Sequence, residues 1–500
     1  MEMSRRDFLE RAAAWGGVAL FAGPLAACGR TAPVARRRGE RVVIVGAGLA
    51  GLSCAHRLRQ HGVTARVYEA RQDRVGGRCW TARGFAEGQV AEHGGEFIDS
   101  DHIRMRALVQ ELGLRLEDRV TYAKRRSGFY ARYYLDGALR DEDAVFRGFG
   151  ALQRRLRRAD RRTGFSADGY SSRAARAFDR MTAEQWLDRN LPGGKESLLG
   201  RAAREYLADE FGLDPARLSA TNLFYVIENP ASEPAGGDGS DERFHVHGGN
   251  DQLPRGLAER LPAGALRLDA PLEALWRRSD GSYGLRFGGV RGDVLADRVI
   301  LAIPFTTLRR VDLDGAGLDP LKRRCIEELG MGTNAKVLMQ FTHRPEHYGH
   351  HWDGELITDQ PLSDSWDSSL TQPGHCGLLT VYSGGAVGAS YNAPGPHGPA
   401  PAAVVHETLA SLERAVPGIA RDFNGRAWLD DWVADPWARG SYAAFLPGQV
   451  TTFSSVIARS ERGIHFAGEQ TSVEFQGFLE GAVESGQRCA QEVLASGPLG

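Results

Sequence analysis

The stretch RVVIVGAGLAG, residues 41–51, determines the expected fold. Its first five residues form an almost continuous β-branched run, which is typical of a strand buried in a parallel sheet. The run leads into a GxGxxG turn and then into an amphipathic segment, residues 52–61, that ends at Gly62 as helices commonly do. A second short strand-like run, residues 64–68, closes at Glu69, eighteen positions after Gly51. This strand–turn–helix–strand unit predicts a Rossmann-like dinucleotide-binding domain.

The glycines and the acid of this unit have physical roles in such a domain. Gly46, Gly48 and Gly51 let the backbone approach a pyrophosphate at the positive N-terminus of the following helix. Glu69 would accept hydrogen bonds from an adenosine ribose. The unit alone does not separate NAD from FAD as the cofactor.

Strand-like runs recur along the chain, at residues 298–303, 335–341 and 463–466, and a helical segment follows at 481–494. Five hundred residues are too many for one compact core. We therefore expect an α/β fold in which a discontinuous FAD-binding type of nucleotide domain is interleaved with an α+β substrate domain. The expected nucleotide domain comprises residues 41–92, 241–307 and 428–497, and the expected substrate domain comprises 93–240 and 308–427.

Composition excludes several other functional classes. Lysine and arginine total 62 against 63 acidic residues, so the protein has no excess positive charge with which to attract nucleic acid or an acidic membrane. The six cysteines form no CxxC pair, which argues against a disulfide scaffold or a zinc site, and we expect no metal. An arginine-rich stretch, residues 154–180, contains interspersed apolar residues, which favours a solvated helical face over a docking patch.

The first thirty residues are typical of an export signal rather than of the fold. SRRDFL, residues 4–9, resembles a twin-arginine motif, and the weakly apolar run 12–27 after it is short for a membrane span. LAAC, residues 25–28, resembles a lipobox, in which Cys28 would be lipidated; a nearby cleavage that discards Cys28 is the alternative. We expect export through the twin-arginine machinery to an extracytoplasmic location, with the lipid anchor left open.

Motifs downstream of Glu69 carry a family resemblance. EAR at residues 69–71, VGGR at 75–78 and HGGEFID at 93–99 resemble the corresponding tracts of the flavin-containing monoamine and polyamine oxidases, and the likeness continues over nearly the whole chain after residue 40. It implies FAD as the cofactor, with the guanidinium of Arg78 on the pyrophosphate. The implied cofactor-binding residues are Gly46, Gly48, Gly51, Glu69, Arg71, Gly77, Arg78, Gly94, Gly95, Glu96, Leu272, Gly468, Glu469, Phe478 and Leu479.

The carboxyl-terminal block is the most specific part of the resemblance. GEQT at residues 468–471 and GFLEGA at 477–482 match the family's ribityl contact and the start of a helix that points at the N1–C2 edge of the flavin. Such a helix N-terminus would stabilise the negative charge of the reduced ring by about 0.3–2 kcal/mol.

The resemblance also implies catalytic residues. Lys336 matches the lysine that holds a water near flavin N5, and its charge would favour the superoxide-like state formed when the reduced flavin meets dioxygen. Tyr442 and Phe478 match the two aromatic walls around the substrate amine, and Trp432 matches a tryptophan beside the flavin ring. Desolvation in this slot would favour the neutral amine, which is the form that gives up hydride. Ser441 replaces the flavin-linking cysteine of the mitochondrial enzymes, so FAD would be held non-covalently.

The implied reaction is oxidative deamination of a small-molecule amine, with hydride transfer to flavin N5, hydrolysis of the imine, and release of hydrogen peroxide from dioxygen. An L-amino-acid oxidase of the same fold is the nearest alternative, but this chain has Glu96-Phe97 where those enzymes place a carboxylate-binding arginine. An acid near the entrance would suit a cationic or polyamine substrate. Two further alternatives are an amine dehydrogenase that uses a carrier protein and a non-catalytic dinucleotide-binding module. The identity of the amine and the oligomeric state stay open.

Overall fold

The computed structural model describes residues 41–124, 130–164, 172–224, 240–349, 352–391, 393–472 and 474–496. The expected export signal, Cys28 and the linker 31–40 lie outside the described residues. Within these ranges, no helix has both the length and the apolar character needed to cross a bilayer.

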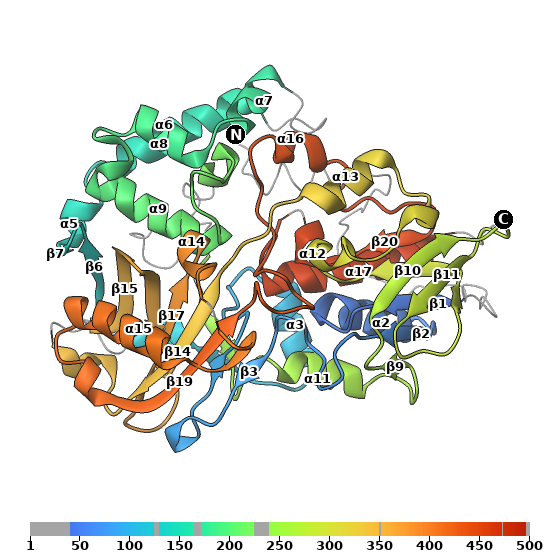
Figure 1. Ribbon diagram of the computed structural model, residues 1–500, viewed down its shortest axis with the longest axis horizontal. Helices are drawn as coiled ribbons and strands as arrows, with labels where there is room; N and C mark the ends of the chain where they lie inside the picture. Colours follow the sequence, from blue (N-terminus) through green and yellow to red (C-terminus); the bar gives the residue numbers. More distant parts are fainter. Residues whose placement is uncertain are drawn as a thin grey trace, which may run out of the picture.

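A five-stranded parallel sheet forms the base of the nucleotide domain (Figure 1). Its order is β20-β13-β1-β2-β9, with the GxGxxG turn directly after the central strand β1. The bounds are β1 (Val42–Val45), β2 (Ala65–Tyr68), β9 (Leu266–Arg267), β13 (Arg298–Leu301) and β20 (Ile464–Phe466). Because these strands come from the start, middle and end of the chain, the expectation of an interrupted Rossmann-like domain is confirmed.

Two helices from opposite ends of the chain, α2 (Leu49–Gln60) and α17 (Leu479–Ala495), pack together on one face of this sheet (Figure 1). Their contact is close: a Cβ at Gly486 would lie 2.1 Å from the carbonyl oxygen of Ala50. A second core forms on the other face, where the antiparallel strands β10–β12 and helix α13 cover the sheet.

An eight-stranded mixed sheet forms the second domain, in the order β18-β19-β14-β17-β16-β15-β6-β7. Helix α15 packs on one face of it, and helix α9 contacts β15, β16 and β17. The bounds are β6 (Tyr130–Leu135), β7 (Ala138–Arg140), β14 (Ala335–Phe341), β15 (Trp352–Gln360), β16 (Leu362–Asp367), β17 (Gly377–Ser383), β18 (His397–Pro399), β19 (Phe423–Asp431), α9 (Leu198–Phe211) and α15 (Ala402–Ala415).

The remaining elements connect or cover these two sheets. The strands are β3 (Thr81–Ala82), β4 (Ala91–Glu92), β5 (Leu116–Asp118), β8 (Phe244–Val246), β10 (Leu272–Arg277), β11 (Tyr283–Phe287) and β12 (Val294–Ala296). The helices are α3 (Ile103–Glu111), α4 (Arg119–Lys124), α5 (Glu142–Val145), α6 (Phe149–Thr163), α7 (Arg173–Asp179), α8 (Ala183–Asn190), α11 (Gln252–Glu259), α12 (Phe305–Leu308), α13 (Pro320–Glu328), α14 (Gly385–Gly388) and α16 (Gln449–Phe453). The 3₁₀ turns are η1 (Ala86–Gly88), η2 (Gly194–Glu196), η3 (Ala220–Phe224), η4 (Asp314–Ala316), η5 (Pro345–Tyr348), η6 (Ala420–Asp422) and η7 (Glu469–Thr471).

Three expected domain boundaries shift in the structure. Helix α3, expected in the substrate domain, buries Met105 and Leu108 in the same core as α2 and α17. Helix α13 likewise buries Cys325 and Ile326 in the second core of the nucleotide domain, although the sequence assigns it to the substrate domain. The expected boundary at residue 428 falls inside β19, which pairs with β14 as far as Asp431. The domain boundaries therefore follow the packing of apolar helix faces and the pairing of strands, and they do not coincide with the positions of the sequence motifs.

The described parts of the arginine-rich stretch, residues 154–164 and 172–180, form solvated helical faces as expected. Helix α6 buries Leu152, Leu156 and Thr163, while its arginines are exposed. The described cysteines are all unpaired.

Candidate active site

A cavity of about 2290 Å³ lies between the two domains. The glycine turn, the start of α17, strand β14 and helix α9 all contribute to its lining. Sites for single small ligands usually enclose roughly 300–1,000 Å³, so this cavity has room for a dinucleotide and a second molecule.

The glycine turn forms a cradle at one end of the cavity. A Cβ at Gly46, where φ is +100°, would lie 2.6 Å from the carbonyl oxygen of Ala302, and a Cβ at Gly51 would lie 2.0 Å from that of Gly46. Backbone packing therefore requires these two glycines. A Cβ at Gly48 would meet nothing closer than the Gly76 carbonyl at 4.0 Å, and Gly48 lines the cavity. Since no side chain caps α2 within the described residues, its first amides and this open space suit a pyrophosphate.

Glu69 orders the turn beside this cradle. Its carboxylate accepts hydrogen bonds from the backbone amides of Ala47 at 2.7 Å and Arg71 at 2.9 Å. Burial raises the pKa of Glu69 above the usual value of a glutamate, although these two hydrogen bonds oppose the shift. The carboxylate oxygens keep further lone pairs, so the residue fits its expected role as a ribose acceptor.

Two arginines expected at the cofactor also line the cavity. Arg78 donates to the Ser441 carbonyl and, at 3.0 Å, to the carboxylate of Glu469. Arg71 forms an ion pair with the fully buried Asp435. Both guanidinium groups are thus held by carboxylates of the carboxyl-terminal part of the chain, and each keeps donors that fit a phosphate.

The start of α17 borders the cavity opposite the glycine turn. Glu469 fixes this region because its carboxylate accepts from the amide of Gly477 at 2.9 Å as well as from Arg78. A Cβ at Gly95 would lie 2.6 Å from the side chain of Leu479, so the absent side chain lets α17 approach. No side chain caps α17 among the described residues, and its dipole is directed at the cavity.

Lys336 lies in a buried ion pair that the sequence did not predict. Its Nζ donates to Oε2 of Glu96 at 3.0 Å and to the carbonyl oxygens of Gly94 at 2.8 Å and Glu92 at 3.1 Å. Glu96 also accepts from Nε1 of Trp366 at 3.0 Å. The sequence suggested an acid near the entrance, but the Glu96 carboxylate is instead held by Lys336 in the buried part of the cavity lining.

Charge explains why Glu96 stays ionised. Burial alone would raise its pKa, but the charges of Lys336 and Arg119 lower the pKa below the usual value of a glutamate. Both side chains of the pair are 5% exposed, so the pair is shielded from bulk water.

Aromatic side chains surround Lys336. Nζ lies 5.1 Å from the ring centre of Trp366 and 5.9 Å from that of Tyr382. The hydroxyl of Tyr382 shares a 2.9 Å hydrogen bond with that of Tyr442, which also donates to the carbonyl of Asp209. Sequence reasoning found Tyr442 but missed Tyr382 and Trp366. Tyr382 reaches the site because it pairs directly with Lys336 across β14 and β17, a long-range register that no local sequence pattern indicates.

The other expected site residues also line the cavity. Phe478 precedes α17, and its ring lies 5.4 Å from that of His102 in an edge-to-face contact. The indole of Trp432 donates to the carbonyl of His93 at 3.0 Å. Leu272 lines the cavity at the start of β10. Ser441 donates from Oγ to the side-chain carbonyl of Asn334 at 2.6 Å, so its hydroxyl is used within the protein.

Behind Trp432 the structure brings together a buried chain of hydrogen-bonded histidines and aspartates. His93 Nδ1 lies 2.9 Å from Asp430, whose carboxylate also contacts Nδ1 of His397 at 2.7 Å. His397 Nε2 contacts Asp435 at 2.8 Å, and Asp435 binds Arg71. No sequence pattern predicted this network, since His93, His397 and the pair Asp430 and Asp435 come from separate segments of the chain.

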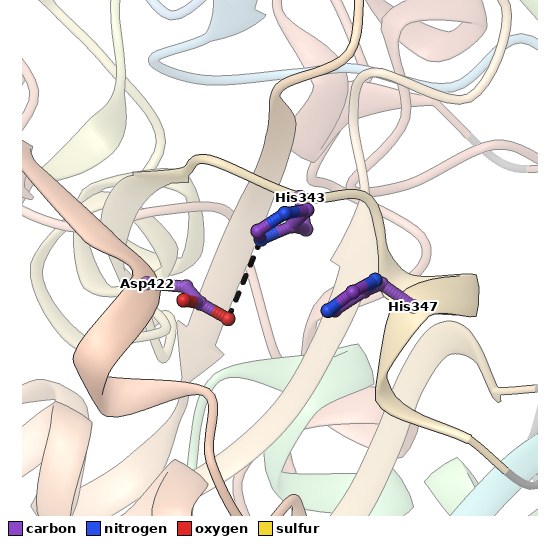
Figure 2. A group of neighbouring side chains, drawn as sticks. All are labelled: His343, His347 and Asp422. Atoms are coloured by element: carbon purple, nitrogen blue, oxygen red, sulfur yellow. Dashed lines mark ion pairs between the residues drawn. The ribbon is translucent and has the colours of Figure 1, made fainter.

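Two groups of possible metal ligands occur within the described residues. His343, His347 and Asp422 lie together at one end of β14 (Figure 2), and Asp99, Asp101 and His102 border the cavity. The rings of His343 and His347 stack in parallel, 3.9 Å apart with an interplanar angle of 10°. Stacked rings do not direct their nitrogens at one point, so this group would have to rearrange to bind an ion.

An interrupted nucleotide domain whose glycine turn shares a cavity with a buried lysine and aromatic side chains defines a dinucleotide-dependent oxidoreductase. Residues 49–494 match the family described as flavin containing amine oxidoreductase, and the chain therefore belongs to that family. It is accordingly a flavoenzyme that oxidises amines.

Curated relatives are similar over most of their length. An L-amino-acid oxidase from Siganus canaliculatus is 26% identical, over 91% of this chain and 85% of the relative. A putative flavin-containing monoamine oxidase, AofH, from Mycobacterium tuberculosis is 28% identical, over 91% of this chain and 96% of the relative.

Solved structures show the same fold. A putrescine oxidase bound to putrescine has a TM-score of 0.75 at 23% identity, covering 91% of this chain and 99% of that one. A cyclohexylamine oxidase from Brevibacterium oxydans has a TM-score of 0.76 at 22% identity, covering 91% and 98% of the two chains.

Proposed function

We propose that the protein binds FAD non-covalently, oxidises an amine at the carbon next to nitrogen, and returns the electrons to dioxygen with release of hydrogen peroxide. One observation carries this proposal. The same cavity is lined at one end by Gly48, Glu69 and Arg78 and at the other by Lys336 and Tyr442.

The residues that would hold FAD follow from the geometry. Gly48 and the first amides of α2 fit the pyrophosphate, with Arg78 beside them, and Glu69 fits the ribose. The N-terminus of α17 suits the edge of the ring that gains negative charge. Because Ser441 has no thiol and its hydroxyl binds Asn334, we propose that the cofactor is not covalently linked at this position. When bound, FAD supplies the hydride acceptor.

Protein side chains then act on the substrate. Tyr382, Tyr442 and Phe478 line the cavity and would exclude water from the reacting amine. Such a desolvated slot lowers the pKa of an ammonium group and so increases the neutral form, whose lone pair assists loss of hydride. Lys336 provides the positive charge that favours reduction of dioxygen, although Glu96 neutralises part of its field.

The electrostatics disfavour an amino acid as the substrate. Its α-carboxylate would have to enter a cavity whose α9 and second-sheet walls carry acidic side chains, including Asp209 and Asp364, which offer an anion no positive partner. Glu96 also stands where L-amino-acid oxidases place a carboxylate-binding arginine, and its carboxylate is paired with Lys336.

Anaerobic mixing with an amine panel tests the proposal. We expect purified protein to be yellow, to release FAD on acid denaturation, and to lose its flavin absorbance with amines but not with L-amino acids. Admission of air should restore the colour with one peroxide per turnover. Reoxidation by a cytochrome but not by air would identify a dehydrogenase instead.

We also propose that the protein is exported through the twin-arginine machinery, on the basis of the SRRDFL motif at residues 4–9. Replacement of Arg5 and Arg6 by lysine should retain the flavoprotein in the cytoplasm. Unchanged export of this variant would contradict the proposal. Radiolabelled lipid incorporation at Cys28, absent from Cys28→Ala, tests the lipid anchor.

A further inference from the structure

A cluster of carboxylates lines the end of the cavity formed by helix α9 and the second sheet. The nucleotide domain contributes Arg71, Arg78 and Arg310. Helix α9, the second sheet and residue 242 contribute carboxylates: Asp209, Glu210, Glu242, Asp353, Glu355 and Asp364. The first set suits the phosphates of a dinucleotide, whereas the second suits a cation.

Positive groups near the acidic end are already engaged or lie on the surface. Lys336 is paired with Glu96, and Arg243 is paired with Asp118 at 2.8 Å. Arg157 also lines the cavity, but it is exposed on helix α6. Arg119 and Arg132 also act on this end, because their charges lower the pKa of Glu355 and of Asp353 respectively, yet burial keeps the pKa values of both acids raised.

Strand register places one of these acids in line with the catalytic lysine. Lys336 in β14 pairs with Tyr382 in β17, which pairs with Asp364 in β16. Paired residues on neighbouring antiparallel strands point to the same face, and strands are about 4.8 Å apart. The backbone of Asp364 is thus roughly 10 Å from that of Lys336 on the same cavity wall. Glu355 shares this face, because it lies two residues before Ile357, the partner of Asp364.

One oxygen of each of two carboxylates at this end lacks a hydrogen-bond partner among the described residues, although the Asp209 carboxylate also accepts a hydrogen bond from the side chain of Ser363. Oδ1 of Asp209 and Oδ1 of Asp364 are shielded from solvent and accept no hydrogen bond from any described residue. Asp209 adjoins the aromatic wall, since its backbone carbonyl accepts from Tyr442. Buried polar groups are nearly always hydrogen-bonded, so this pair indicates a missing donor. A cation between them would also relieve the repulsion that, after burial, raises the pKa of Asp364.

We propose that Asp209 and Asp364 bind the distal ammonium group of an aliphatic diamine or polyamine while its other amine lies beside Lys336 and Tyr442. The inference rests on the proposed amine oxidation and specifies its substrate class. Glu242 and Glu355 line the same end of the cavity and would meet a third ammonium group of a longer polyamine.

Matched amine pairs test this proposal. For the wild-type holoenzyme, kcat/KM for putrescine should exceed that for n-butylamine, and kcat/KM for cadaverine should exceed that for n-pentylamine. In Asp364→Asn and Asp209→Asn, each diamine-to-monoamine ratio should fall by about 10- to 100-fold, the range for loss of a charged hydrogen-bond partner. Two variants are used so that a folding defect in one leaves the other informative. Both should retain the flavin spectrum.

Asp314→Asn is the matched control, because Asp314 is 86% exposed on η4 in the nucleotide domain. It should leave both ratios unchanged. Equal turnover of diamines and monoamines by the wild type, or an unchanged ratio in both cavity variants, would overturn the ammonium site while amine oxidation stands. Failure of every amine to reduce the flavin would overturn the proposed function and this inference with it.

Discussion

Replacement of Gly48 by alanine should weaken cofactor binding without disrupting the fold. Gly48 has φ −73° and ψ 178°, a conformation open to any residue, and an added Cβ would meet no protein atom closer than 4.0 Å. Without cofactor, Gly48→Ala should therefore lower the free energy of unfolding only by the difference between glycine and alanine at an N-cap, about 1 kcal/mol or less.

The same methyl group would occupy the space proposed for the pyrophosphate. Overpacking by one methyl group costs about 1–3 kcal/mol, which corresponds to a roughly 5- to 150-fold higher dissociation constant for FAD. Titration of FAD into deflavinated protein, followed by flavin fluorescence, measures this change. Thermal unfolding of the same samples measures the stability of the folded protein.

Gly51→Ala is the contrasting variant. Its Cβ would lie 2.0 Å from the carbonyl oxygen of Gly46, so α2 would have to move, and we expect loss of folded protein even without cofactor. The reasoning would be refuted if Gly48→Ala bound FAD as tightly as the wild type. It would equally be refuted if the two variants unfolded at the same reduced temperature.

Two further predictions concern charge. Lys336→Met should slow reoxidation of the flavin by air by about tenfold or more, as measured by stopped flow. It should also lower the free energy of unfolding by about 3–5 kcal/mol, as measured with denaturant, because the buried carboxylate of Glu96 loses its charged partner. Adding Glu96→Gln should recover the stability but not the oxidation rate. The free energy of unfolding should fall as pH rises from about 6.5 to 8, because burial raises the pKa of Glu205 to about 8. The folded state then holds protons that the unfolded state has already lost; a melting temperature that increased over this range would contradict the prediction.

Local sequence patterns predicted the elements that hold the cofactor well. The β-branched run at residues 41–45 became β1, and the run at 335–341 became β14 with the same bounds. Helix α17 begins at Leu479, two residues before the expected start, because no capping side chain marks its N-terminus. The glycines of the nucleotide turn could be picked out from the sequence because the turn needs fixed spacing, and their roles toward the cofactor stay predictions.

The substrate side was less accessible to sequence reasoning. Glu96 was interpreted as an entrance acid, since nothing in its neighbourhood shows that Lys336, 240 residues away, is its partner. Asp209, Asp364 and Tyr382 converge only through strand register and the packing of α9. Long-range pairing sets such contacts, and no single segment carries a signal for them.

A structure of the purified holoprotein at atomic resolution tests the central claim most directly. The account predicts FAD in the cavity, with its pyrophosphate beside Gly48 and Arg78 and its ring between the start of α17 and Lys336. A colourless protein that refuses added FAD, or a flavin bound away from the glycine turn, would contradict it.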